Sequence, residues 1–142
     1  MIHYVGTQQY SVTALTDSSG TIKERYAYDA YGGLSIFDGS GAARASTAED
    51  NRYTYTGREY DDGLDLYHYR ARMYDAMCGR FLSRDPIGFD GSLWNIYEFL
   101  DSTPLSSSDP NGTDRWVING VTGPQNCMRR NTRRITSTIL LL

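Results

Sequence analysis

The sequence has 142 residues and a hydrophobic fraction of 39%, enough for one modest core but below the usual share of a globular domain. Twelve tyrosines, with abundant glycine, aspartate and serine, favour short strands and tight turns, and the lack of an apolar run of about 18 residues excludes a transmembrane helix. The formal charge of −3 is unevenly distributed: residues 1–112 hold sixteen acids and nine bases, whereas residues 113–142 hold one acid and five arginines. This change of sign indicates a boundary between two regions of the chain near residue 112.

Residues 1–37 are predicted to form strands joined by turns. A β-prone stretch over residues 10–16 ends at the turn Asp17-Ser-Ser-Gly20, and residues 21–28 then alternate. A period of two places four side chains on one face of that strand: Ile22, Glu24, Tyr26 and Tyr28. Residues 38–51 are small and polar, and we expect a loop there.

Residues 52–84 carry the strongest strand signals. One alternating strand is predicted over residues 66–74. Its two faces would hold, on one side, Tyr67, Tyr69, Ala71 and Met73, and on the other, His68, Arg70 and Arg72. Two turns of the form Asp-Pro-x-Gly follow, at Asp85–Gly88 and, 24 residues further on, at Asp109–Gly112. Either turn alone is common, since Pro fixes φ, Asp bonds the backbone and Gly supplies a positive φ.

These motifs resemble the rearrangement-hotspot (Rhs) family of tyrosine–aspartate (YD) repeat proteins, which form β-cages around bacterial toxins. Residues 15–20 and 26–32 are similar to the YD repeat, and residues 53–89 are similar to the family's core signature. The resemblance implies an all-β fragment from the C-terminal end of a shell, built from short antiparallel strand–turn–strand repeats. Residues 52–112 would be the RHS repeat-associated core domain, and residues 113–142 an irregular tail where the family has its variable toxin.

The two aspartates of these turns are the candidate chemical groups. Two carboxyls brought close together share one proton, and such a pair can activate water or polarise a peptide carbonyl. Asp85 and Asp109 would meet if the segment between them folds back as a hairpin. Three side chains are predicted to bury this return: Trp94, Ile96 and Phe99.

The family resemblance assigns roles to these residues. It implies an intramolecular aspartyl protease that releases the toxin, with Asp85, Asp109 and Arg72 as catalytic residues and a cut at the Thr113–Asp114 bond. The chain departs from the family pattern at three places: Thr113 replaces a leucine, Ser102-Thr-Pro104 replaces Asn-Asn-Pro, and Gly6-Thr-Gln-Gln-Tyr10 replaces a His-x-Asp-x-x-Gly turn. With these departures, the two aspartates could instead serve only as turn residues.

The implied partners are the remainder of an Rhs shell, a C-terminal toxin segment and a component of a secretion system. The parent protein would be secreted or displayed on a bacterial cell surface, although Met1–Tyr4 begins no export signal. Two other hypotheses stay open, a surface adhesion module that binds through its tyrosines and a degenerate gene remnant. Cys78, Cys127 and His68 form no recognisable motif, and we expect no cofactor, metal, nucleic-acid partner or membrane insertion.

Overall fold

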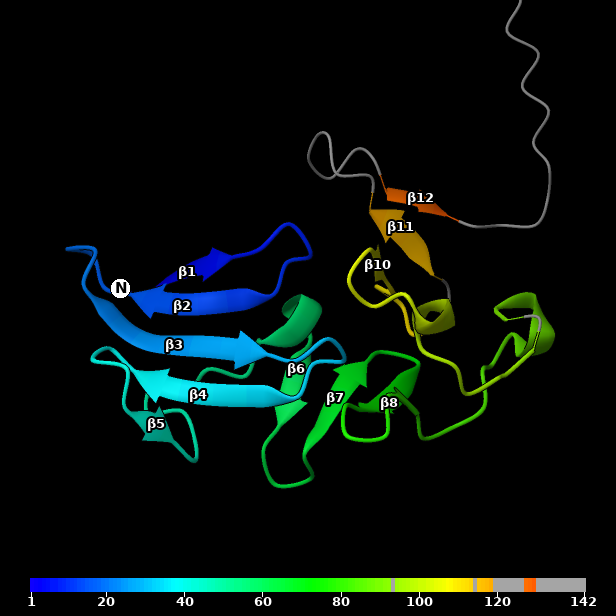
Figure 1. Cartoon of the computed structure of the whole chain (residues 1–142), viewed down its shortest axis with the longest axis horizontal. Helices are drawn as coiled ribbons and strands as arrows, with labels where there is room; N and C mark the ends of the chain where they lie inside the picture. The colour runs from blue at the N-terminus through cyan, green and yellow to red at the C-terminus, as the bar shows by residue number, and fades with distance from the viewer. Residues whose placement is uncertain (93, 114, 119–126, 130–142) are drawn as a thin grey trace, which may run out of the picture.

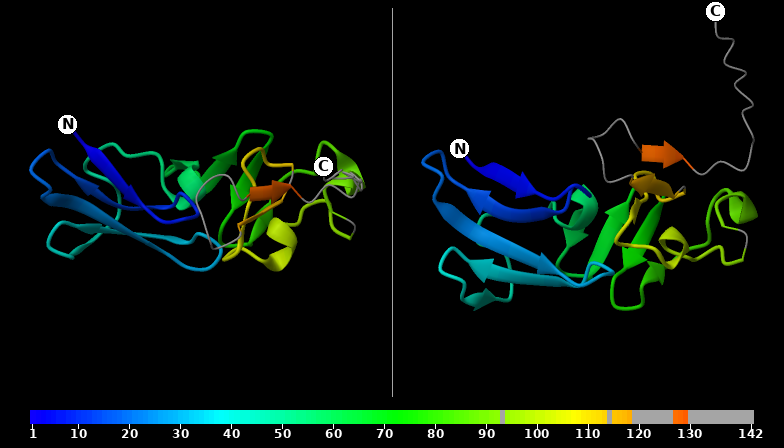
Figure 2. Two further views of the ribbon diagram at one scale, coloured as in Figure 1. Left: turned by 90° about the horizontal axis from the view of Figure 1, so that it is seen from above. Right: turned by 45° about the horizontal axis from the view of Figure 1, so that its top comes forward.

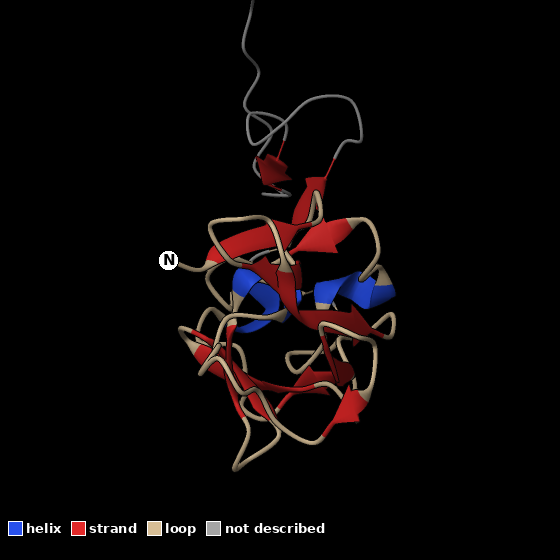
Figure 3. Cartoon of the chain, turned by 90° about the vertical axis from the view of Figure 1, so that its left-hand side faces the viewer, coloured by secondary structure: helices blue, strands red, loops and turns tan. Residues whose placement is uncertain are grey.

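The computed structural model describes residues 1–92, 94–113, 115–118 and 127–129. In these residues twelve strands and three short 3₁₀ helices make up the regular structure, with no α-helix among them. The strands form three antiparallel sheets, which confirms the all-β prediction. In Figure 1 the first sheet (blue to cyan) lies beside the second (green), and Figure 2 shows the same arrangement from two other sides. Figure 3, coloured by secondary structure, shows that strands and loops dominate the described residues. Within the described part, no helix is long and apolar enough to cross a bilayer.

The first sheet is a meander of five strands in sequence order. They are β1 (His3–Gly6), β2 (Val12–Thr16), β3 (Ile22–Tyr28), β4 (Leu34–Asp38) and β5 (Ala43–Arg44). The predicted alternation of β3 is confirmed, because Glu24 and Tyr26 are buried while Lys23 and Arg25 are exposed. The short strand β5 lies inside residues 38–51, which the sequence predicts to be a loop.

One kind of turn joins the strands of this sheet. Three turns begin at an aspartate whose Oδ1 accepts the backbone N–H groups two and four residues later, at 2.8 to 3.0 Å: Asp17, Asp29 and Asp38. In the turn between β1 and β2, Thr7 Oγ1 accepts the N–H groups of Gln9 and Ser11 in the same way. Tyr10 takes the left-handed position there, with φ +65°. The turn that departs from the family pattern therefore keeps the common geometry.

The second sheet contains a hairpin that the sequence analysis missed. Its strands are β6 (Glu59–Asp61), β7 (Leu66–Tyr69), β8 (Arg72–Asp75) and β9 (Arg80–Phe81). The prediction of one strand over residues 66–74 is wrong, because the chain reverses at Arg70 and Ala71. Arg70 has a left-handed φ of +60°, which allows this tight reversal.

This reversal changes which side chains face the core. Tyr69 pairs with Arg72 and Tyr67 pairs with Tyr74, and all four side chains are buried. The prediction that placed Arg72 on the opposite face from the two tyrosines is therefore wrong. Two residues predicted for the tyrosine face are instead exposed or half-buried: Ala71 and Met73.

The chain after β9 doubles back before it enters the third sheet. The Phe81 N–H donates to the Tyr97 carbonyl at 3.0 Å, and the Asp85 N–H donates to the Ile96 carbonyl at 2.9 Å, which confirms the predicted return. Two 3₁₀ helices lie on this path, η2 (Gly88–Asp90) and η3 (Leu100–Ser102). The third sheet then consists of β10 (Ser107–Ser108), β11 (Trp116–Ile118) and β12 (Cys127–Arg129). Because β11 and β12 fall within residues 113–142, that segment is not irregular throughout.

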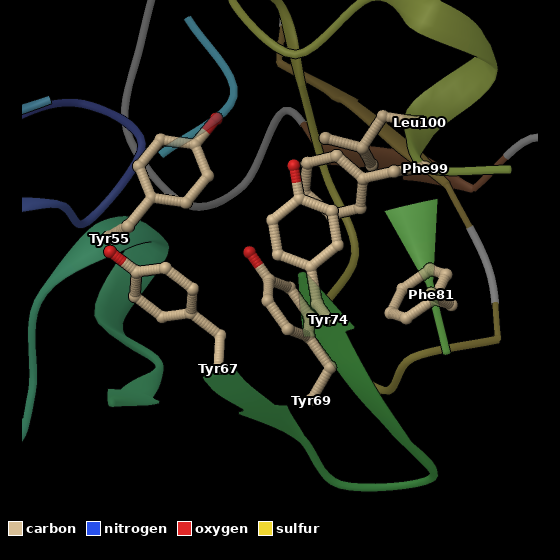
Figure 4. Close-up of a cluster of buried hydrophobic side chains, with 7 residues drawn as sticks. All are labelled: Tyr55, Tyr67, Tyr69, Tyr74, Phe81, Phe99 and Leu100. Carbon is tan, nitrogen blue, oxygen red and sulfur yellow. The ribbon is translucent and has the colours of Figure 1, made fainter. Parts of the chain in front are cut away.

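The main hydrophobic core is mostly aromatic. It consists of seven buried side chains shown in Figure 4: Tyr55, Tyr67, Tyr69, Tyr74, Phe81, Phe99 and Leu100. Tyr74 stacks on Phe99 with ring centroids 3.9 Å apart. The prediction that Phe99 helps to bury the segment that folds back between Asp85 and Asp109 is confirmed, and Ile96 is half-buried. The same expectation for Trp94 is wrong, because its side chain is 88% exposed.

Tyrosine hydroxyls connect the first two sheets. The hydroxyls of Tyr55, Tyr67 and Tyr74 donate to the backbone carbonyls of residues 30–32 at 2.7 to 3.0 Å. Residues 30–32 belong to the turn between β3 and β4, so the core of the second sheet is bonded to the end of the first. Burial raises the pKa of all three hydroxyls, which therefore remain donors at neutral pH.

Candidate functional site

The structure brings the three predicted catalytic side chains together in the interior. The hairpin of β7 and β8 turns Arg72 inward, where its side chain is 3% exposed. The guanidinium lies over the Phe81 ring, 3.6 Å from the ring centroid. Its Nη2 is 3.0 Å from Asp85 Oδ2 and 3.6 Å from Asp109 Oδ2. Both carboxyls are nearly fully buried, as a coupled pair requires.

Arg72 also binds the backbone of two further segments. Its Nε donates to the Gly112 carbonyl, and its Nη1 donates to the Ile96 carbonyl at 3.2 Å. Burial lowers the pKa of Arg72, whereas Asp85 and Asp109 oppose this decrease because they stabilise the charged guanidinium. One arginine therefore joins β8, the return segment and the second Asp-Pro-x-Gly turn.

Each site aspartate uses one carboxyl oxygen for its turn and directs the other toward Arg72. Asp109 Oδ1 accepts the N–H groups of residues 111–113 at 2.8 to 3.2 Å. Asp85 Oδ1 accepts the N–H of Ile87 at 2.9 Å. The Oδ2 atoms of both residues contact the guanidinium. A role in the turn and a role in a site are thus compatible in the same side chain.

The second Asp-Pro-x-Gly turn is docked against the β7–β8 hairpin. The Ala71 N–H donates to the Asn111 carbonyl at 3.3 Å, and Arg70 Nη1 donates to Asn111 Oδ1 at 2.7 Å. A side chain at Gly112 would collide with the Tyr69 carbonyl oxygen, so only glycine fits this contact. The turn is therefore held in place by atoms that no local sequence signal identifies.

Gly91 lies between a site carboxyl and the predicted scissile carbonyl. A Cβ atom at Gly91 would be 2.5 Å from Asp85 Oδ2 and 2.8 Å from the Thr113 carbonyl oxygen. Both oxygens therefore approach the same small volume, which is open only because residue 91 has no side chain. Thr113 is half-buried, and Asp114, the other predicted cleavage residue, lies outside the described residues.

His68 and Cys78 lie outside this site. The His68 side chain is exposed. Cys78 is exposed as a free thiol, and its hydrogen bond with Asp75 raises the pKa of the thiol. The side chain of Cys127 lies outside the described part of the structure. In the described residues, no group of three or more His, Cys, Asp or Glu side chains is arranged to hold a metal ion.

Curated proteins with similar sequences include a nuclease and a toxin subunit. The chain is 37% identical over 110 residues to the tRNA3(Ser)-specific nuclease WapA of Bacillus spizizenii, a match that covers 75% of this chain and 4% of WapA. It is 33% identical over 96 residues to the toxin subunit YenC1 of Yersinia entomophaga, covering 68% of this chain and 9% of YenC1. The chain thus spans less than a tenth of these relatives. No protein-family model matches it.

A solved structure of a toxin complex has a similar fold. The TcdB2-TccC3 structure matches 78% of this chain and 5% of its own, with a TM-score of 0.66 and 30% sequence identity. A structure titled TcdB2-TccC3-Cdc42 matches with a TM-score of 0.64 and 28% identity over the same share of each chain. Together with WapA and YenC1, these structures support the broad assignment to the Rhs family that the motifs predict.

Proposed function

We propose that this chain is the C-terminal end of an Rhs shell that encloses a toxin, and that it cuts its own backbone between Thr113 and Asp114. The observation that carries the proposal is the buried group of Arg72, Asp85 and Asp109, which adjoins the backbone leading into that bond. The similarity to toxin-shell proteins supports the setting, in which the rest of the shell and a C-terminal toxin are the partners. The parent protein would be secreted or displayed, because such a toxin acts on other cells.

The geometry suggests a role for each carboxyl in peptide hydrolysis. Asp109 removes a proton from one water molecule, whose oxygen attacks the carbonyl carbon of Thr113. Asp85, whose Oδ2 borders the same space at Gly91 as the Thr113 carbonyl oxygen, donates its proton to that oxygen. The tetrahedral intermediate then collapses: Asp109 passes the proton taken from water to the Asp114 nitrogen, the C–N bond breaks, and one of the two hydroxyls on the former carbonyl carbon returns a proton to Asp85. The products are a carboxyl group at Thr113 and a free amine at Asp114.

Arg72 would set the charge of this pair and hold the substrate. One guanidinium balances one of the two buried carboxylates, and the remaining negative charge favours a proton shared between them. The bond from Arg72 to the Gly112 carbonyl fixes the peptide unit just before the one that is cut. A lysine would supply a charge but could not reach all four acceptors from one planar group.

The experiment is an intact-mass time course of freshly purified chain. The parent chain should lose a peptide that begins at Asp114, and Asp109→Asn should slow this cut by at least about 100-fold because it removes a proton acceptor. Asp38→Asn is the matched control, since Asp38 forms the same kind of turn with a carboxyl that is only half-buried. It should cut like the parent.

Two other results have clear meanings. A cut at Asp85–Pro86 in all three chains, or at Asp109–Pro110 in the two chains that retain Asp109, indicates acid-labile Asp-Pro bonds and contradicts a role for the site. A parent chain that stays intact at the Thr113–Asp114 bond overturns the proposed protease and leaves these aspartates as turn residues within a shell fragment.

A further inference from the structure

Arg115 is the second residue after the proposed cut, and it is anchored to the core of the chain. Its side chain is 12% exposed, and its Nε lies 3.1 Å from Asp101 Oδ2. This contact is ionic rather than a hydrogen bond, because the Nε–H does not point at the carboxylate. Arg115 Nη1 also donates to Thr103 Oγ1 at 2.8 Å. A charged side chain that is this well covered and has a carboxylate partner is held in a fixed position.

The polar groups that contact Arg115 lie at the end of η3 and in the segment after it, and hydrogen bonds within that segment hold them in place. The Thr103 hydroxyl donates to the Leu100 carbonyl at 2.7 Å, so its oxygen lone pairs face the arginine. Ser107, which is fully buried, lies 3.0 Å from Thr103 Oγ1 and completes this small polar recess. The residues that form this recess therefore precede the proposed cut in the sequence, whereas Arg115, which occupies the recess, follows the cut.

A strand pairing holds the same downstream segment. Trp116 pairs with Ser108 and Val117 pairs with Ser107, which joins β11 to β10. Strand β10 ends directly before Asp109. The chain therefore leaves β10, passes through the site, and returns to β10 in β11. Both arms that flank the Thr113–Asp114 bond are fastened to the same part of the fold.

We infer that Arg115 is a positioning residue that fastens the downstream side of the scissile bond and keeps the cleaved segment docked. The inference rests on the proposed function, because it assumes a cut at Thr113–Asp114. The upstream side is held by Asp109 and Arg72, and without Arg115 the described downstream residues would keep the short β10–β11 pairing as their link to the rest of the chain. Cleavage alone then leaves the segment that begins at Asp114 bound, and its release needs a separate event that breaks the Arg115 contacts.

The first test does not depend on cleavage, because it uses the full chain with Asp109→Asn. Hydrogen exchange should show protected amides at residues 116–118, and adding Arg115→Ala should speed their exchange at least about tenfold, since local opening becomes easier. Asp101→Asn should have the same effect from the other side of the contact, and Arg115→Lys should restore part of the protection. Arg25→Ala, which removes an exposed arginine of β3, is the control. Unprotected amides, or protection unchanged by Arg115→Ala, overturn the inference.

The second test uses the chain with Asp109 intact. If the chain cuts, the segment from Asp114 should co-elute with residues 1–113 in size exclusion and separate only in denaturant, whereas with Arg115→Ala the cut should be slower and the segment should be lost. A segment that separates under native conditions contradicts the inference while leaving the cut itself established. If the chain does not cut, the proposed function fails, and the exchange experiment alone decides whether Arg115 fastens the segment.

Discussion

The two carboxyl oxygens of the site aspartates have separate tasks. In the first sheet, Asp17 and Asp38 also hold a turn through Oδ1 and place Oδ2 near a basic side chain. Those aspartates are only half-buried, whereas Asp85 and Asp109 are buried around Arg72. Burial makes their charges interact strongly, because water no longer screens them. The same turn motif is therefore structural in one place and a candidate site in another.

Gly91 provides a sharp test at this scale. Gly91→Ala would place a methyl group against Asp85 Oδ2 and the Thr113 carbonyl oxygen, so these atoms must move apart. A displacement of about 1 Å can reduce such a reaction about 100-fold, and we expect the cut at residue 113 to slow by at least about tenfold. The measurement is the intact-mass time course. Gly63→Ala, where an added Cβ meets only a contact at 3.4 Å, should cut normally. Equal rates in both variants would contradict this role of Gly91.

At the scale of elements, tight turns limit what the sequence can predict. The hairpin at Arg70 and Ala71 has no Gly, Asn or Asp, so residues 66–74 look like one strand. The core still forces the reversal, because it buries Tyr67, Tyr69 and Tyr74 together. The turn ending at Tyr10 is similar, since its hydrogen bonds form although a tyrosine replaces the usual glycine. Tertiary packing decides the hairpin, whereas the turn at Tyr10 is held locally by the Thr7 hydroxyl.

Glu24 links two elements and should make stability depend on pH. Burial raises its pKa, but hydrogen bonds from Tyr26, Ala48 and Thr47, with the charge of Arg44, outweigh burial and lower the pKa below the ordinary value of 4.5. A carboxyl with a lowered pKa stabilises the fold above its unfolded pKa, and this contribution is lost as the pH falls through the folded pKa.

Replacing the Glu24 carboxyl should therefore reduce the loss of folding stability that occurs as the pH falls. Glu24→Gln should unfold at a lower urea concentration than the parent at pH 7. The gap should shrink as the pH falls from about 4.5, where the unfolded parent takes up a proton at Glu24, toward the lowered pKa at which the folded parent does so too. Urea midpoints measured from pH 7 to pH 3 test this. Glu49→Gln changes an exposed carboxyl and is the control. A gap that stays constant over this range would contradict the ionic role of Glu24.

At the scale of the whole chain, buried tyrosine hydroxyls should couple the first two sheets. Tyr67→Phe removes a donor to the Gly32 carbonyl while keeping the ring, so it should lower the free energy of unfolding by about 1 to 3 kcal/mol. Equilibrium urea unfolding followed by circular dichroism measures this. Tyr53→Phe is the control, because Tyr53 is 53% exposed. An unchanged midpoint for Tyr67→Phe would show that the hydroxyl adds nothing to the coupling.

The sequence predicted the class of fold and the residues of the site, but not how they meet. Alternation of tyrosines indicated strands, and the two Asp-Pro-x-Gly turns indicated Asp85 and Asp109. The supporting contacts join residues far apart, as when the Gln9 side chain donates to the Pro104 carbonyl at 2.8 Å. Gly91 likewise has no motif that marks it. Such contacts depend on tertiary structure, which local patterns do not encode.

Arg72 draws together parts of the chain that lie up to 40 residues apart. Its four acceptors come from the turn at Asp85, the Ile96 carbonyl and the turn from Asp109 to Gly112. They meet only after β8, the return segment and the last turn have all docked. The proposed cut, which is irreversible, would therefore occur only after this end of the shell has finished folding. A misfolded shell would not make the cut, and the C-terminal toxin would stay covalently attached to it.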